Sequence, residues 1–357
     1  MKQKLPPEES KRLSMLRFPL IVAVVFIHAN NDRIGMPDPE GGSALYVHWL
    51  RRFLSEGLAA VAVPLFFLIS GYLFFAGWDF STAGFMTRLK SRIRTLLIPY
   101  LFWNIALALV LALATQVPQA SALLSGKQGT FIQSGPLAWI SAIGGFSGPP
   151  VVYQFWFLRD LMVAVCLVPV FHLAHRFLPG LWLVLLGIPW FTHSWPLPSP
   201  SAVGPLFFFL GSWIAVSGKS LFALDRAWPW ILPLHLGVVI LGLVGGFHSA
   251  NPTIHQVGIL LGVLSALCLS SKIAGHAGLS TRLVSLTSSA FLVFAVHEPI
   301  LTILRRLSFK AFGSPSPSVD LLLYFALPTI AIVFAWAQDK ALRQWTPRLA
   351  ALVSGGR

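Results

Sequence analysis

Two ionisable side chains, Arg17 and His28, stand at the ends of an apolar stretch, "RFPLIVAVVFIH", near the start of the sequence. Eleven helical positions complete three turns with about 20° to spare, so both side chains share one face, about 16 Å apart along the axis. A neutral imidazole can act as a general base for a hydroxyl group near pH 7. A guanidinium can hold phosphate oxygens in a fixed fork. One helix face can therefore anchor a phosphate-bearing molecule at one end and carry out chemistry at the other.

Two further apolar segments contain adjacent ionisable residues. "FAVHEPI" contains His297 followed by Glu298, and "QFWFLRDLMV" contains Arg159 followed by Asp160. Ionisable groups inside membrane segments are usually functional, and we expect His297 to share a cavity with His28. Neighbouring helix positions point about 100° apart, so we expect Arg159 and Asp160 to find partners on other helices rather than each other. A structural interhelical ion pair and a polar cavity both satisfy that expectation.

A basic segment, "TRLKSRIR", follows the second apolar block and contains Arg88, Lys90, Arg92 and Arg94. We expect it to lie in a cytoplasmic loop over residues 78–95. Its charges either set the orientation of the chain in the membrane or bind a polyphosphate.

Two other polar residues have open roles. Asp32 follows His28 by one helical turn and can either orient the imidazole or lie solvated in a loop. Asn104, in "PYLFWN", is expected to join the intramembrane polar network.

The elements that position these residues are predicted to be membrane spans. The chain has 357 residues, of which 55% are hydrophobic and 11% charged, and its apolar residues fall in blocks long enough to cross a bilayer. This composition predicts an all-α, polytopic transmembrane helix bundle with about ten spans. We place the spans at 14–30, 57–77, 95–117, 155–176, 180–196, 203–218, 228–247, 254–272, 285–303 and 319–338.

The net charge of +14 follows from basic residues near the span ends, so it does not indicate nucleic-acid binding. Lys and Arg concentrate on the side of the N-terminus, which predicts that both termini are cytoplasmic. We expect a cytoplasmic N-terminal segment over 1–13, one transmembrane domain over 14–338 and a cytoplasmic tail over 339–357. The two cysteines are not spaced like metal ligands, and we expect no metal site.

Taken in order, these motifs resemble those of the acyltransferase 3 family of bacterial integral-membrane enzymes. The resemblance rests on the Arg-x10-His spacing of residues 17–28, "FFLISGYLF", the basic segment leading to "IPYLFWN", "FWFLRDL" and "FAVHEPIL". It implies a multi-pass protein of the bacterial cytoplasmic (inner) membrane that takes acetyl-CoA, or another acyl-CoA, from the cytoplasm. The acyl group passes to a hydroxyl of an extracytoplasmic or lipid-linked glycan or glycolipid, as in surface-polysaccharide O-acetyltransferases. Acyl-CoA is then a co-substrate, and no permanently bound cofactor is implied.

The resemblance suggests roles for the singled-out residues. Arg17 and the basic segment hold the CoA phosphates, although Arg88, Arg92 and Arg94 depart from the family's usual Arg-x-x-Arg spacing. His28 deprotonates the acceptor hydroxyl or transiently takes the acyl group, and His297 with Arg159 positions the acceptor or stabilises the oxyanion.

Two alternatives and one assembly remain open. The same intramembrane charges suit a transporter of small anions or a glycolipid flippase. A homodimer is also permitted, since we expect Gly71 and Gly211 to be exposed small-residue notches at which another helix can approach closely.

Overall fold

The computed structural model describes residues 5–30, 41–116, 131–245, 252–313 and 315–356. Within these ranges the chain is helical and contains no strand. The α-helices are α1 (Pro7–Ala29), α2 (Gly42–Arg52), α3 (Ala62–Phe75), α4 (Thr82–Arg92), α5 (Ile98–Ala114), α7 (Pro136–Gly144), α8 (Trp156–Cys166), α9 (Val168–Phe177), α10 (Pro179–Phe191), α11 (Val203–Val216), α12 (Trp228–Gly245), α13 (Pro252–Ala274), α14 (Ala277–Leu286), α15 (Ala290–Phe312), α16 (Pro317–Trp345) and α17 (Pro347–Ser354). Short π or 3₁₀ turns connect several of them, namely η2 (Phe53–Leu58), η3 (Ala59–Val61), η4 (Ile93–Leu97), η7 (Tyr153–Phe155), η8 (Asp225–Ala227) and η9 (Thr287–Ser289).

Seven continuous helices in the described ranges are long and apolar enough to cross a membrane. They overlap seven of the ten predicted spans over nearly all of their length. The predicted span 155–176 corresponds to α8 and α9, which are bent by 56° relative to each other, and the two shortest predicted spans correspond to α10 and α11. The all-α, polytopic fold is therefore confirmed. The number of spans and the side of each terminus stay predictions.

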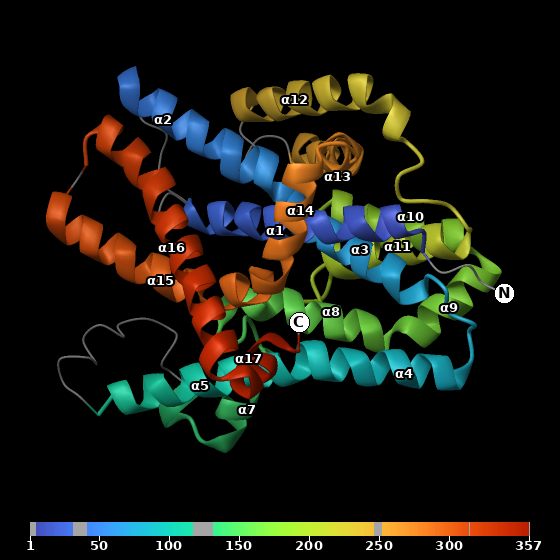
Figure 1. The fold of residues 1–357 in the computed structure, drawn as a ribbon, viewed down its shortest axis with the longest axis horizontal. Helices are drawn as coiled ribbons and strands as arrows, with labels where there is room; N and C mark the ends of the chain where they lie inside the picture. The colour runs from blue at the N-terminus through green and yellow to red at the C-terminus, as the bar shows by residue number, and fades with distance from the viewer. Residues whose placement is uncertain (1–4, 31–40, 117–130, 246–251, 314, 357) are drawn as a thin grey trace.

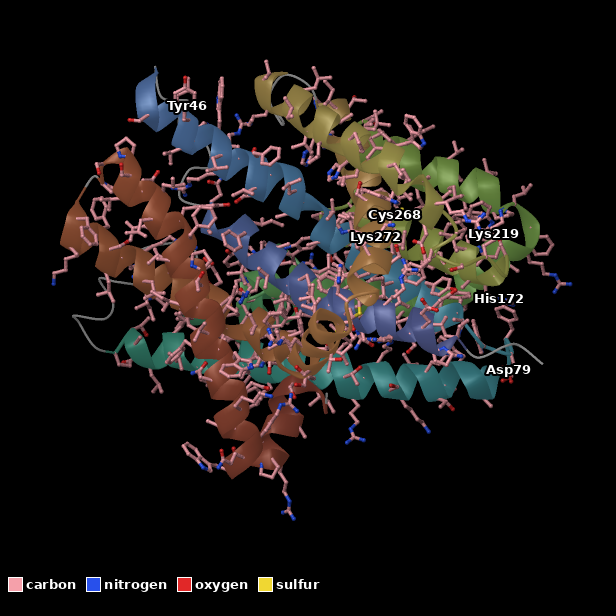
Figure 2. The ribbon with its side chains drawn as sticks, turned by 45° about the horizontal axis from the view of Figure 1, so that its top comes forward. Tyr46, Asp79, His172, Lys219, Cys268 and Lys272 are labelled. Atoms are coloured by element: carbon pink, nitrogen blue, oxygen red, sulfur yellow. The ribbon has the colours of Figure 1, made fainter. Side chains whose placement is uncertain are left out.

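The ends of the bundle agree with the predicted alternation of the chain. Figure 2 places Asp79 and Lys219, from two different connections, at one end of the bundle, together with His172 of α9, and Tyr46 at the opposite end. Asp79 and Lys219 belong to connections predicted to face the cytoplasm, His172 lies near the end of the predicted span 155–176, and Tyr46 belongs to a connection predicted to face outward.

The prediction of a loop over 78–95 was wrong. The Ser81 hydroxyl accepts a hydrogen bond from the Gly84 amide at 3.0 Å and so caps α4, which continues through η4 into α5 as one helix from Thr82 to Ala114. The basic side chains thus stand on a helix, where spacing decides which of them face the same way.

The predicted tail over 339–357 is largely helical in the structure. Helix α16 continues to Trp345, and α17 packs against α5, where the Trp103 indole donates a hydrogen bond to the Val353 carbonyl at 3.0 Å.

The closest helix packing in the core is between α3 and α11 (Figure 1). A Cβ atom added to Gly71 would lie 2.0 Å from the Phe208 carbonyl oxygen, and one added to Gly211 would lie 2.0 Å from that of Leu68. Both glycines are buried, so the expectation that they are exposed notches for a homodimer was wrong. The small residues let two helices of the same chain approach closely.

Replacing Gly71 or Gly211 by alanine should destabilise the fold, because a methyl group cannot fit against the facing backbone. Overpacking of this kind costs about 1–3 kcal/mol. The melting temperature in detergent should fall for both variants. Gly237→Ala on α12 is the matched control: nothing lies within 4 Å of its added Cβ, so stability should be unchanged or slightly higher. Equal effects at all three positions would contradict this account of the packing.

Candidate functional site

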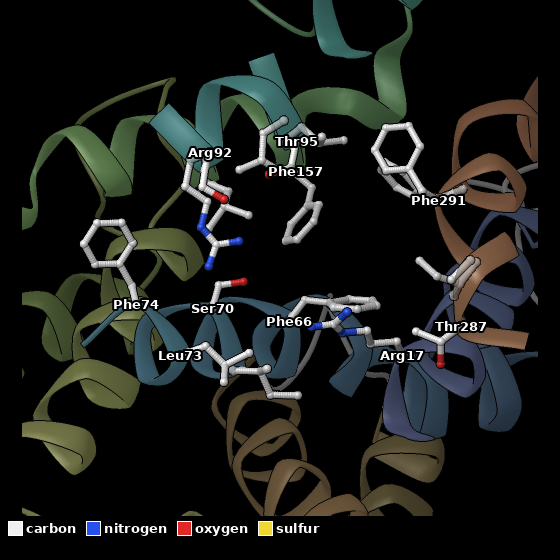
Figure 3. Close-up of a pocket in the computed structure, with 18 of the residues that line it drawn as sticks. Arg17, Phe66, Ser70, Leu73, Phe74, Arg92, Thr95, Phe157, Thr287 and Phe291 are labelled. Atoms are coloured by element: carbon white, nitrogen blue, oxygen red, sulfur yellow. The ribbon is translucent and has the colours of Figure 1, made fainter. Parts of the chain in front are cut away.

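A cavity of about 520 Å³ opens among α1, α3, α4, α8 and the start of α15 (Figure 3). Polar groups and aromatic rings both line it. The aromatic lining consists of Phe66, Phe74, Phe157, Phe291 and Phe294. The cavity therefore combines charged groups with apolar surface.

Three arginines reach this cavity from two helices. Arg17 comes from α1, and Arg88 and Arg92 come from α4, where a spacing of four residues puts them on one face. Arg92 lies within electrostatic range of both Arg17 and Arg88. None of the ion pairs among the described residues includes any of the three. Figure 3 shows the guanidinium groups of Arg17 and Arg92 reaching the cavity from different walls, so an anion there can meet more than one positive charge.

Arg94 lies outside this group. It is two residues beyond Arg92, which turns it about 200° around the helix, and it is exposed rather than part of the cavity lining. Its position gives no support to the phosphate-binding role expected from the sequence.

Aromatic rings lead from the cavity toward the histidines. Phe157 lies 5.7 Å from Phe66 and 6.1 Å from Phe294, measured between ring centroids. The ring of Phe294 is in turn 6.1 Å from that of His297. The apolar part of the cavity is therefore one ring away from an imidazole.

His28 and His297 lie side by side, with ring centroids 5.1 Å apart. The Nδ1 atom of His297 donates to the backbone carbonyls of Phe294 at 2.8 Å and Val293 at 3.1 Å. Because a carbonyl oxygen only accepts, the proton of the neutral ring is on Nδ1 and the lone pair is on Nε2. That Nε2 atom is buried and has no hydrogen-bond partner among the described residues.

Sequence reasoning missed two residues that contact His28. The Tyr153 hydroxyl lies 2.8 Å from Nδ1 of His28, and Arg305 donates from Nη2 to the His28 carbonyl at 3.1 Å. Arg305 also forms an ion pair with Glu298 at 3.1 Å. Both residues reach His28 across more than a hundred positions of sequence, so no local pattern could have identified them.

Asn104 does take part in this region, through the backbone. Its Oδ1 atom accepts from the Val152 amide at 2.9 Å, which holds the residue just before Tyr153. The predicted contact between Asp32 and His28 concerns a residue outside the described ranges.

Arg159 is placed differently from the prediction. Its Nε donates to Asp160, its own neighbour, at 3.0 Å, and its Nη1 donates to the carbonyls of Gly145 at 2.6 Å and Gly148 at 2.7 Å. The expectation that Arg159 and Asp160 do not pair was wrong, because a long arginine side chain can fold back across 100° of helix rotation. Arg159 does not line the cavity, and its hydrogen bonds hold the 145–148 backbone onto α8.

Replacing Arg159 by glutamine should therefore lower thermal stability. The change leaves the fully buried Asp160 carboxylate without its cation, and breaking such a buried pair typically costs about 3–5 kcal/mol. Thermal unfolding in detergent measures the loss. Arg226→Ala, at an exposed site, is the control that should unfold like the wild-type protein. Wild-type stability of Arg159→Gln would contradict the structural role of Arg159.

Comparison with known proteins assigns the region that contains the cavity and the histidines to a family. A sequence profile described as "Acyltransferase domain", that of the acyltransferase 3 family, matches residues 11–337, a range that contains every residue of the cavity and of the histidine pair. The chain is also similar to the succinoglycan biosynthesis protein ExoH of Rhizobium meliloti (strain 1021). The two are 27% identical over 359 residues, which cover 98% of this chain and 92% of that protein. No solved structure matches the chain significantly.

Proposed function

The chain belongs to the acyltransferase 3 family and is a multi-pass membrane O-acyltransferase, and from that membership we propose the donor, the acceptor and the chemistry. The donor is a cytoplasmic acyl-CoA carrying an acetyl or another short acyl group. The acceptor is a hydroxyl of an extracytoplasmic or lipid-linked glycan. The protein then acts in the bacterial cytoplasmic membrane, with the arginine end of its cavity facing the cytoplasm, where acyl-CoA is available. The printed name of the similar protein refers to succinoglycan, which makes a polysaccharide the acceptor class to test first.

One observation carries this proposal: three arginines, which form no ion pair with any other described residue, are connected to two adjacent imidazoles by a row of neighbouring aromatic rings. Phosphates suit the arginines, because a guanidinium donates in a planar fork that matches phosphate oxygens. The rise of α1 puts Arg17 and His28 about 16 Å apart. That separation suits the extended thiol-bearing arm of CoA, whose apolar stretches can lie against the Phe66, Phe157 and Phe294 rings.

In the proposed reaction, Nε2 of His28 takes the proton of the acceptor hydroxyl as its oxygen attacks the thioester carbon. The new ester C–O bond forms, the C–S bond breaks, and the CoA sulfur leaves with the proton returned by the imidazolium. His297 can only accept a hydrogen bond at Nε2, since its own proton is held by the Phe294 and Val293 carbonyls. Of the two roles predicted for His297, its tautomer suits positioning of the acceptor hydroxyl and not donation to an oxyanion.

The test uses the purified full chain in nanodiscs with radiolabelled acetyl-CoA and a cell-envelope polysaccharide fraction. We expect label in the polysaccharide, removable by mild alkali as an ester. The same protein in sealed vesicles distinguishes the transporter and flippase alternatives, which predict accumulation of substrate without a labelled product. Absence of labelled polysaccharide with every acyl-CoA of two to four carbons would overturn the proposal.

A further inference from the structure

We propose that Tyr153, Glu298 and Arg305 are positioning residues that hold the proton of His28 on Nδ1 and so keep Nε2 available as the base. We call this hydrogen-bonded set the relay. It rests on the proposed function, in which His28 deprotonates the acceptor. The relay comes from the turn η7, which carries Tyr153, and from the middle of α15, which carries Glu298 and Arg305, and it meets His28 at the C-terminal turn of α1.

The direction of each hydrogen bond follows from the groups that meet. Glu298 accepts a side-chain hydrogen bond from the Tyr153 hydroxyl, and an ionised carboxylate can only accept. The Tyr153 hydroxyl then donates its proton to Glu298, so the Tyr153 oxygen can only accept a hydrogen bond from another group. The atom 2.8 Å away from that oxygen is Nδ1 of His28, which must donate. A neutral imidazole that donates at Nδ1 has its lone pair at Nε2.

Arg305 keeps Glu298 in the ionised form that this direction requires. Its Nη2 atom lies 3.1 Å from Oε2 of Glu298, and the carboxylate is buried, so without a cation it would lose stability as an anion. The same Nη2 atom donates to the His28 carbonyl at 3.1 Å. Thr302 adds a hydrogen bond to Oε1 of Glu298 at 3.2 Å, which fixes the carboxylate without belonging to the proton path.

The sequence "HEP" also explains how η7 is held in place. Pro299 lacks an amide proton and therefore leaves the Ala295 carbonyl without its usual partner in the α15 helix. Gln154, the residue after Tyr153, donates to that carbonyl from Nε2 at 3.1 Å. On the other side, Asn104 binds the Val152 amide. Tyr153 is thus fixed between α5 and α15. A group that selects a tautomer must be held in a fixed position in this way.

Glu298→Gln is the decisive substitution because it preserves the shape of the side chain and replaces one accepting oxygen by a donating NH₂ group. Arg305 can only donate and its Nη2 atom lies nearer to Oε2 than to Oε1, so we expect the amide oxygen at the Oε2 position and the NH₂ group toward Tyr153. The NH₂ donates to the Tyr153 oxygen, the hydroxyl then donates to Nδ1 of His28, and the His28 proton moves to Nε2. We expect kcat to fall by roughly 10²–10⁴-fold, the size of a lost general base, with the KM for acetyl-CoA unchanged.

The tautomer itself is measurable by nitrogen-15 NMR of histidine-labelled protein, with the His28 signals identified by their absence from a His28→Ala sample. The wild-type protein should show the proton of His28 on Nδ1, and Glu298→Gln should show it on Nε2. Adding Tyr153→Phe to Glu298→Gln removes the group that enforces the wrong tautomer, so the double variant should be more active than Glu298→Gln alone. A purely structural role for Glu298 predicts that the double variant is less active than Glu298→Gln alone.

Thr302→Val is the matched control, since it removes a hydrogen bond to the same carboxylate outside the proton path; its kcat should stay within a few-fold of wild type. The relay is overturned if Glu298→Gln keeps wild-type kcat, or if its His28 proton stays on Nδ1. Should Glu298→Gln not fold, Tyr153→Phe alone must release the His28 proton into a mixture of both tautomers, and an unchanged tautomer overturns the relay. Failure of the proposed function is distinguishable, because wild-type protein then gives no labelled polysaccharide while the tautomer measurement still tests the relay.

Discussion

Replacement of His28 by alanine is expected to reduce acyl transfer by roughly 10²–10⁴-fold, the contribution typical of a positioned general base. Nε2 of His28 is the proposed acceptor of the hydroxyl proton, and alanine offers nothing in its place. The protein should remain inserted and folded, because His28 is only partly buried at the last turn of α1 and the ten buried residues of that helix are unchanged. Initial rates with labelled acetyl-CoA and the polysaccharide fraction measure the loss.

A buried histidine elsewhere in the bundle provides the control. His235 on α12 is 5% exposed and faces Gly262 rather than the cavity, so His235→Ala should affect stability and leave transfer largely intact. Full activity of His28→Ala, or an equal loss in His235→Ala, would refute the assignment of the base. Incubation with labelled acetyl-CoA alone adds a second test: direct transfer leaves the protein unlabelled, whereas an acyl-imidazole intermediate would label wild-type protein and not His28→Ala.

Helix periodicity was enough to predict that Arg17 and His28 share one face of α1. The spacing of Arg17 and His28 is a property of a regular helix, and the structure has one unbroken helix over that stretch. The expectation that His297 shares a region with His28 also agrees with the observed 5.1 Å between the rings, because few ionisable groups lie inside apolar segments and those must find polar company.

What periodicity could not predict are contacts decided by side-chain reach and by long-range packing. Arg159 folds back onto Asp160 and two carbonyls, although the helix rotation between the neighbours suggested separate partners. Tyr153 and Arg305 reach His28 across 125 and 277 positions, and nothing in their local sequence distinguishes them from other polar residues near span ends. The tertiary arrangement of α1, η7 and α15 is what assigns them a place beside the imidazole.

The basic segment shows the same distinction at the donor end. Four cations in eight residues predicted an anion site or a topological signal, and the composition alone could not say which of the four cations face a ligand. The helix that replaces the expected loop does distinguish the four cations. Arg88 and Arg92 share the face toward Arg17, whereas Lys90 and Arg94 are exposed. This division makes the donor site testable within a single helix.

Arg92→Ala should raise the KM for acetyl-CoA by about 10- to 100-fold, because a charge-assisted hydrogen bond to phosphate contributes about 1.5–3 kcal/mol. The kcat at saturating donor should change little, since Arg92 is on a different element from His28 and remote from the proposed reacting atoms. Arg92→Lys should recover part of the affinity, because the ammonium keeps the charge but loses the planar fork. Steady-state kinetics at fixed acceptor concentration separates the two parameters.

Arg94→Ala is the matched control, with the same residue type and the same loss of charge two positions away on the exposed face. Its KM for acetyl-CoA should stay close to that of the wild type, particularly at physiological salt, where exposed charges separated by more than about 8 Å are screened. A similar rise in KM for Arg92→Ala and Arg94→Ala would mean that the segment attracts the donor only through its total charge. A rise confined to Arg17, Arg88 and Arg92 would place the CoA phosphates in the cavity, because these three arginines share its lining and Arg94 does not.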